Sequence, residues 1–117
     1  MNNLLPVFMK LENQPCLVVG GGKIAYQKIR QLLDSKAYVT VIAPLIIDSI
    51  KSLSVEIIKR NYKSVDIKKY QLVIAGTDNE KVNKQIYHDA KRRGVPVNVV
   101  DQPKLCSFYM GSVYQDG

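Results

Sequence analysis

Short runs of apolar residues, each closed by a glycine or a turn residue, recur along the chain. Residues 16–19, 72–75 and 97–100 are three such runs. A run of this length between turn residues is typical of a strand that is buried on both faces of a parallel sheet. Residues 38–43 are rich in β-branched side chains and stop at Pro44, which predicts a fourth strand.

Longer segments with the period of an amphipathic helix separate these strands. Apolar residues recur at helical spacing over residues 24–33. Thr77 and Glu80 have the spacing of a capping box, with Asp78 as an alternative cap, so a second helix is predicted over residues 79–93. Strands that alternate with helices in this way predict an α/β domain with a mostly parallel sheet and helices on both faces.

The remaining segments have weaker patterns. Residues 7–11 and 107–110 each fit one more strand, and residues 55–59 alternate as an outer strand does. Residues 45–53 fit a short helix, whereas residues 63–70 are polar and irregular. These segments add detail at the margins of the predicted sheet and leave its centre unchanged.

The size and composition of the chain indicate one soluble domain. The chain has 117 residues, of which 46% are hydrophobic and 23% charged, so residues 1–117 are expected to form a single domain. The N-terminus lacks a basic region and is interrupted by Pro6, and no apolar run has the length of a membrane span. Cys16 and Cys106 are interpreted as free thiols in a reducing compartment. We therefore expect a cytoplasmic protein with no membrane partner.

The net charge of +7 favours an anionic partner. The one basic cluster, residues 91–93, falls at the end of a predicted helix, where cations stabilise the helix dipole. Because RNA-binding aromatic motifs and zinc-finger spacings are missing, no nucleic-acid partner is predicted. His88 is the only histidine and no cysteine stands near it in the sequence, so no protein metal site is predicted.

A glycine-rich turn between the first strand and the first helix carries the clearest chemical signal. Gly20, Gly22 and Ala25 fit the G-x-G-x-x-G/A fingerprint of dinucleotide-binding domains. Gly20 allows the tight turn, Gly22 lets the backbone approach a pyrophosphate, and Ala25 allows close helix packing. The sequence thus predicts a Rossmann-like NAD(P)-binding domain whose cofactor pyrophosphate lies on Gly20, Gly21 and Gly22, at the helix N-terminus.

One part of the fingerprint is missing. An acidic residue usually follows about 20 positions later, at the end of the second strand, and holds the ribose hydroxyls. Residues 40–44 contain no carboxylate, and the next one is Asp48. Ribose recognition must therefore use backbone groups or a hydroxyl. No arginine stands there to bind a 2′-phosphate, which favours NAD over NADP.

Asp101 is the second candidate for function. It follows the predicted strand over residues 97–100, at the sheet edge that carries the glycine turn, where ligands bind in open α/β sheets. A carboxylate there can meet a substrate beside the nicotinamide. Its position equally suits the first residue of an Asp-Gln-Pro turn. Thr77 and Asp78 lie at the same edge, but helix capping accounts for them.

Taken together, four segments resemble the precorrin-2 dehydrogenase family, the N-terminal module of siroheme synthases. They are residues 20–25, 39–44, 75–78 and 97–101. The most specific segment is 98–101, followed by Pro103 and Ser107-Phe108, and the resemblance runs from Leu5 through Tyr114. It implies NAD-dependent dehydrogenation of precorrin-2, a tetrapyrrole, to sirohydrochlorin in siroheme biosynthesis. In some members it implies insertion of ferrous iron, as a second substrate, as well.

The resemblance also implies roles for individual residues. Asp101 takes the place of the catalytic aspartate, which serves as a general base. The implied NAD contacts are Gly22, Lys23, Ile24, Pro44, Leu45 and Thr77. The family likewise lacks the ribose carboxylate, and its substrate carries many carboxylates, which suits the positive net charge.

Members of the family continue past the position of Gly117 into a segment that completes the active site and a helical region that forms a dimer. We therefore expect a homodimer at full length and no turnover by this chain alone. An alternative of another class is a non-catalytic module that senses NAD to regulate a partner. That module would bind NAD without any dependence of its function on Asp101.

Overall fold

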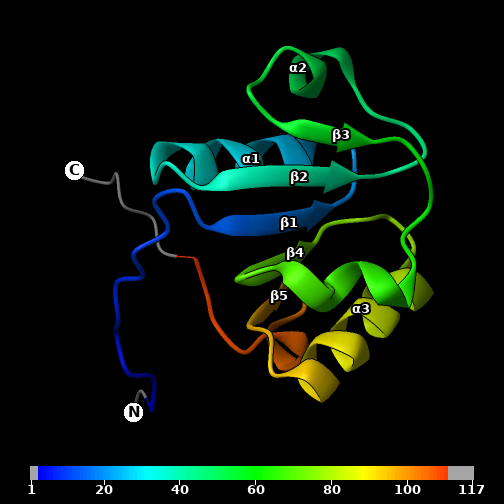
Figure 1. Ribbon diagram of the computed structural model, residues 1–117. Coiled ribbons are helices and arrows are strands. Elements are labelled where there is room, and N and C mark those ends of the chain that lie inside the picture. Colours follow the sequence, from blue (N-terminus) through cyan, green and yellow to red (C-terminus); the bar gives the residue numbers. More distant parts are fainter. Residues whose placement is uncertain (1–2, 111–117) are drawn as a thin grey trace.

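The apolar runs of the sequence form one parallel sheet in the computed structural model, which describes residues 3–110 (Figure 1). Its strands are β1 (Pro15–Val19), β2 (Tyr38–Ile42), β3 (Glu56–Ile58), β4 (Leu72–Ala75) and β5 (Val97–Val99). They lie in the order β3-β2-β1-β4-β5, and every neighbouring pair is parallel. The strand order reverses between β1 and β4, which is where open α/β sheets bind their ligands.

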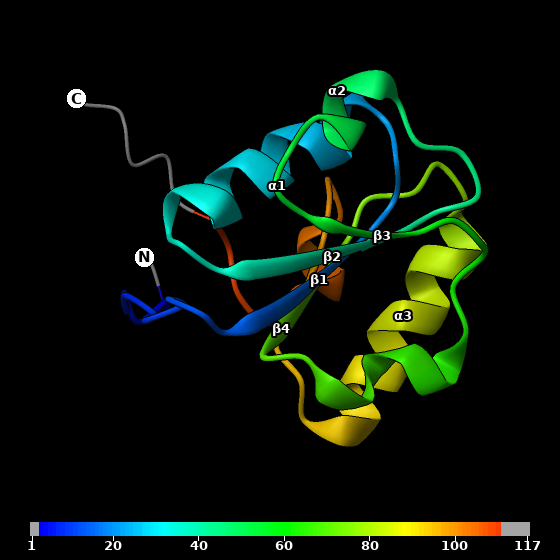
Figure 2. The same cartoon turned by 45° about the horizontal axis from the view of Figure 1, so that its top comes forward.

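Helices cover both faces of this sheet, as predicted. α1 (Lys23–Asp34) and α2 (Asp48–Lys51) lie on one side, and α3 (Glu80–Arg93) lies on the other with the 3-10 helix η1 (Ser64–Lys69) (Figure 1). A second view of the same arrangement shows the strands passing between α1 and α3 (Figure 2). A short 3-10 helix, η2 (Pro103–Leu105), follows β5.

Alternate side chains of the central strand, β1, pack into two separate hydrophobic cores, one on each face of the sheet. Val18 of β1 packs with Ile29 of α1 on one face, whereas Leu17 packs with Ile86 of α3 on the other. All four side chains are fully buried. Burial on both faces explains why β1 reads as a continuous apolar run and not as an alternating one.

The ends of α3 confirm one predicted cap and correct the other. Gly94 ends the helix with a φ of 70°, the left-handed conformation expected of a C-terminal glycine. At the start, the cap is Asn79, whose side chain accepts hydrogen bonds from the amides of Lys81 and Val82. The capping box predicted for Thr77 and the alternative cap at Asp78 are both wrong, because Asn79 takes the N-cap position. The Thr77 hydroxyl instead accepts a hydrogen bond from the Asn79 amide at 3.1 Å.

Two predicted strands do not form. Residues 7–11 have no regular structure. Leu11 is buried, but residues 7–10 are exposed, with Phe8 at 96%, so pairing them as a strand would bury little apolar surface. Residues 107–110 lie beside β5 without forming a strand of the sheet. The Ser107 amide donates to the Val97 carbonyl at 2.8 Å, but the further contacts with β5 are made through side chains. The amide of Val97 donates to the Ser107 hydroxyl at 2.8 Å, and the Asn98 side chain donates to the Phe108 carbonyl at 3.0 Å. Residues 111–114, the last part of the family resemblance, lie outside the described residues.

Residues 63–70 were predicted to be irregular, yet they contain η1. The two terminal nitrogens of the Arg60 guanidinium, Nη1 and Nη2, donate to the Asp66 carboxylate at 2.8 and 2.7 Å, and the amide of Lys63 donates to it at 2.7 Å. This cluster holds the turn in place. The Arg60 guanidinium keeps the pKa of Asp66 below its usual value, although burial opposes the shift.

Both cysteines are free, as predicted. Cys16 is fully buried in β1, and this burial raises the pKa of its thiol to about 11, so it stays protonated. Among the helices of residues 3–110, none is long and apolar enough to cross a membrane.

Candidate functional site

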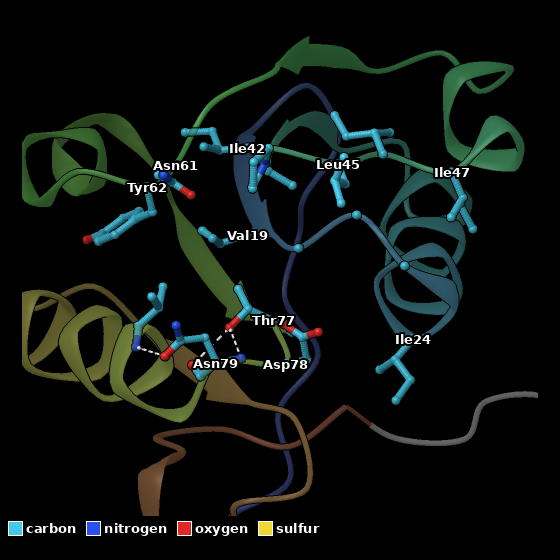
Figure 3. A pocket seen from close by; sticks show the side chains of 18 of the residues that line it. Val19, Ile24, Ile42, Leu45, Ile47, Asn61, Tyr62, Thr77, Asp78 and Asn79 are labelled. Atoms are coloured by element: carbon cyan, nitrogen blue, oxygen red, sulfur yellow. Dashed lines mark hydrogen bonds between the residues drawn. The ribbon is translucent and has the colours of Figure 1, made fainter.

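A cavity of about 830 Å³ lies at the carboxyl edge of the sheet, around the end of β1. Most of its lining comes from four segments: the glycine turn, the loop after β2, the loop after β3, and the loop between β4 and α3 (Figure 3). The register explains why they meet, since Val19 of β1 pairs with Ile42 of β2 and Ala75 of β4. The volume is in the range of small-molecule and cofactor sites, about 300–1,000 Å³.

The three glycines of the turn have different tasks. Gly20 has a φ of 135°, and a Cβ there would stand 2.5 Å from the carbonyl oxygen of Gly76. A Cβ on Gly21 would overlap the carbonyl oxygen of Leu45. At Gly22 a Cβ would meet nothing within 4 Å. The first two glycines therefore let the turn pack between neighbouring loops, and the third leaves open space where a ligand can approach.

The N-terminus of α1 supplies polar groups to this space. Gly22 is its N-cap and provides no side-chain acceptor, and the first turn of Lys23–Asp34 contains no acidic residue. The first amides of a helix have no partner within the helix, and the positive end of its dipole favours an anion. Lys23 adds a cation beside the turn. The arrangement suits a phosphate or pyrophosphate group.

The loop after β2 supplies apolar walls. Leu45 is 80% exposed and lines the cavity with Ile47, and Ile24 lines it from the start of α1 (Figure 3). The amide of Ile47 donates to the Gly21 carbonyl at 2.9 Å, which ties this loop to the glycine turn. The structure thus brings the predicted contacts Pro44 and Leu45 to the same cavity as the glycines. Apolar walls of this kind suit an aromatic ring of a ligand.

Thr77 lines the cavity from the other side of β1, held by a residue that the sequence reading missed. Its hydroxyl donates to Asn83 at 2.6 Å, and the Asn83 amide group donates back to the Thr77 carbonyl at 3.0 Å. Asn83 lies in α3 and is only 9% exposed. The signal in the sequence was a polar residue on the inward face of an amphipathic helix. Because the hydroxyl hydrogen is already used in the bond to Asn83, Thr77 can contact a ligand through its side-chain surface and can accept a hydrogen bond through its hydroxyl oxygen.

Residues 59–62, after β3, were also missed. Lys59, Asn61 and Tyr62 line the cavity. From the sequence, Lys59 was expected only as the last residue of an outer strand, and no role was predicted for Asn61 or Tyr62. The Tyr62 hydroxyl donates to Asp89 of α3 at 2.8 Å, and Asp89 is 5% exposed. Burial, together with this hydrogen bond, raises the pKa of Tyr62. Tyr62 is therefore a fixed, protonated wall of the site.

Asp101 lies at the predicted edge of the sheet but not in the cavity itself. It follows β5, which is separated from β1 by β4, and its side chain is exposed. Its φ of 61° places it in the left-handed region, which aspartate tolerates in turns. The thiol of Cys106 accepts from the Val99 amide at 3.2 Å and donates to the Gln102 carbonyl at 3.3 Å, which fixes both ends of the turn. The catalytic role of Asp101 stays a prediction.

Within residues 3–110, no three His, Cys, Asp or Glu side chains gather in a way that could hold a metal ion. His88, the histidine of α3, is exposed.

Comparison with known proteins identifies similar chains. Residues 7–112 match a family described as putative NAD(P)-binding. A siroheme synthase of Pseudomonas fluorescens is 48% identical over 113 residues, covering 93% of this chain and 24% of that protein. One of Ruthia magnifica is 40% identical over 115 residues, covering 95% of this chain and 24% of that protein. This chain thus spans about a quarter of the length of these relatives.

Among solved structures, SirC, a precorrin-2 dehydrogenase, superimposes with a TM-score of 0.72 and 24% sequence identity, covering 94% of this chain and 53% of that chain. This likeness and the strand order confirm the predicted Rossmann-like fold. The family match confirms the predicted nicotinamide dinucleotide cofactor.

Proposed function

The chain belongs to this NAD(P)-binding family, and we propose that it is the NAD-dependent precorrin-2 dehydrogenase domain of an enzyme of siroheme biosynthesis. The observation that carries the proposal is the similarity to siroheme synthases over at least 93% of the chain. A similarity of that extent includes both the glycine turn and Asp101. The positive net charge suits a substrate that carries many carboxylates.

In this proposal the cavity holds the dinucleotide. The pyrophosphate lies over Gly22 and the first amides of α1, and Lys23 and Ile24 flank it. Pro44 and Leu45 contact the adenosine half, and Thr77 borders the path toward the nicotinamide. When bound, the oxidised nicotinamide accepts a hydride.

Asp101 removes the proton that hydride transfer leaves behind. Dehydrogenation takes one hydride and one proton from precorrin-2, so a base is needed next to the ring. Asp101 follows β5, next to β4, on the edge that bears the cavity, and its exposed carboxylate is accessible to a large substrate. Support for this role comes from its position and from the family resemblance.

The proposal also extends to the full-length protein. The relatives are about four times as long as this chain, and we propose that additional chain of this kind completes the active site and forms a homodimer in the cytoplasm. Ferrous iron would be a second substrate. A tetrapyrrole supplies its own nitrogen ligands, and Asp101 would take the protons that leave them.

The test compares wild type, Asp101→Asn and the control Asp34→Asn, which removes the same charge at the far end of α1. Each is joined to the C-terminal part of a similar siroheme synthase and assayed for NAD-dependent formation of sirohydrochlorin. Loss of a general base lowers the rate by about 100-fold or more, so Asp101→Asn should lose turnover while it still binds NAD. Turnover at the control's rate would remove Asp101 from the mechanism. NAD binding with no turnover in any variant would favour the sensing module.

A further inference from the structure

The end of the cavity that borders β2 and β3 is lined by cations. Lys51 reaches it from α2 and Lys59 from the loop after β3. Among the described residues that line the cavity, the one carboxylate is Asp78, which follows β4 on the other side of β1. The adenosine half of a dinucleotide therefore meets two lysines at this end and no carboxylate among the described residues that line it.

Lys59 stands beside the position where the dinucleotide fingerprint usually places its acidic residue. That residue normally ends the second strand, where this chain has Ala43 and Pro44. Ile42 pairs with Ile58 in the register of β2 and β3, and the Ala43 amide donates to the Ile58 carbonyl at 3.3 Å. Lys59 is thus the neighbour of Ala43 across the sheet, one strand away from the missing carboxylate.

Both lysines can bind an additional anion. Lys59 is exposed, and its ammonium group makes no hydrogen bond or ion pair with another described residue. Lys51 has a partner, with its Nζ 3.7 Å from the carboxylate of Asp48, but both groups are exposed and such pairs are weak. Lys59 also directly follows β3, so its backbone is held in place by the sheet. It is therefore the better placed of the two.

NAD and NADP differ in one group, the phosphate on the 2′-oxygen of the adenosine ribose. A carboxylate at the end of the second strand holds the free hydroxyl and repels that phosphate, whereas a nearby cation accommodates it. A phosphate monoester carries a charge between about −1.5 and −2 at neutral pH, so an adjacent ammonium group strengthens its binding considerably. We infer that this cavity binds NADP as well as NAD, with Lys59 as the main contact of the 2′-phosphate. The inference rests on the dinucleotide site proposed above and adds a second cofactor to it.

The test measures dissociation constants of NAD and NADP by calorimetry for this 117-residue chain. Wild type should bind NADP at least as tightly as NAD. Lys59→Gln should weaken NADP by about tenfold relative to NAD, the worth of one charge-assisted hydrogen bond. Lys84→Gln is the matched control, because it removes the same charge from an exposed position on α3 that does not line the cavity.

A second variant tests the same point in the opposite direction. Pro44→Asp places a carboxylate at the end of the second strand and should weaken the binding of NADP more than that of NAD. If the wild-type chain binds NAD but binds NADP at least tenfold more weakly, the inference is overturned and the proposed function still stands. Equal weakening of both dinucleotides by Lys59→Gln would overturn it as well. Failure of wild type to bind either one would refute the proposed function, and the inference with it.

Discussion

Two adjacent glycines of the turn should respond in opposite ways to the same substitution. In Gly21→Ala the new Cβ overlaps the carbonyl oxygen of Leu45 and stands 3.0 Å from the Cα of Ile46. These atoms belong to the backbone, so no side-chain rotation relieves the contact. In Gly22→Ala the new Cβ meets nothing within 4 Å, and the φ of −103° is ordinary for an alanine. The first change therefore strains the fold, whereas the second intrudes only on the ligand.

The magnitudes follow from these contacts. Overpacking a tightly packed site costs about 1–3 kcal/mol, and a backbone obstacle puts Gly21→Ala near 3 kcal/mol. Shifting the loop also weakens the hydrogen bond from Ile47 to the Gly21 carbonyl, worth about 1 kcal/mol. At roughly 4 °C per kcal/mol, the Tm should fall by about 15 °C. Gly22→Ala changes the free energy of unfolding by about 0.5 kcal/mol, because loss of a permissive cap and reduced chain entropy nearly cancel.

Thermal unfolding and NAD titration of both variants separate these effects. Gly21→Ala should melt well below wild type. Gly22→Ala should melt close to wild type and yet bind NAD at least tenfold more weakly, a loss of about 1.4 kcal/mol. Equal Tm values for Gly21→Ala and wild type would show that the loop does not pack on Gly21. Undiminished NAD affinity in Gly22→Ala would refute the seating of the pyrophosphate over that residue.

Two further predictions concern the polar contacts near the cavity. Tyr62→Phe removes the hydroxyl that donates to the buried Asp89 carboxylate, so Asp89 keeps, among the described residues, only its ion pair with Arg92 at 3.6 Å. The free energy of unfolding, measured in urea, should fall by about 1–3 kcal/mol. An unchanged urea midpoint would contradict this. The lowered pKa of Asp66 means that its contribution to stability is present above the unfolded pKa, about 4, and is lost as the pH falls through and below that value. The urea midpoint should therefore drop between pH 6 and pH 3 by more in wild type than in Arg60→Gln, and equal drops would contradict the pairing.

The sequence predicted the centre of the fold well because burial leaves a clear pattern there. β1 and β4 are covered on both faces, so their apolar runs mark them as strands without further information. The edges were predicted less well. At residues 107–110 strand-like side chains are present, but one hydrogen bond accepted by the Ser107 hydroxyl and one donated by the Asn98 side chain decide the conformation instead.

The candidate site shows the same division. The glycine turn was readable because its spacing follows from backbone geometry alone. Lys59 and Tyr62 were not, since only the register between β2 and β3 brings them to the end of the second strand. That register also changes the interpretation of the adenosine end, because it brings a cation that follows the neighbouring strand next to residues 40–44.

Binding of a dinucleotide at the glycine turn is the central claim, and amide NMR of the isotopically labelled chain tests it most directly. On titration with NAD, the account predicts saturable shifts that are largest at Gly22, Lys23 and Ile24, with smaller ones at Leu45 and Thr77. Absence of saturable shifts, or shifts centred on the basic end of α3 at residues 91–93, would contradict it.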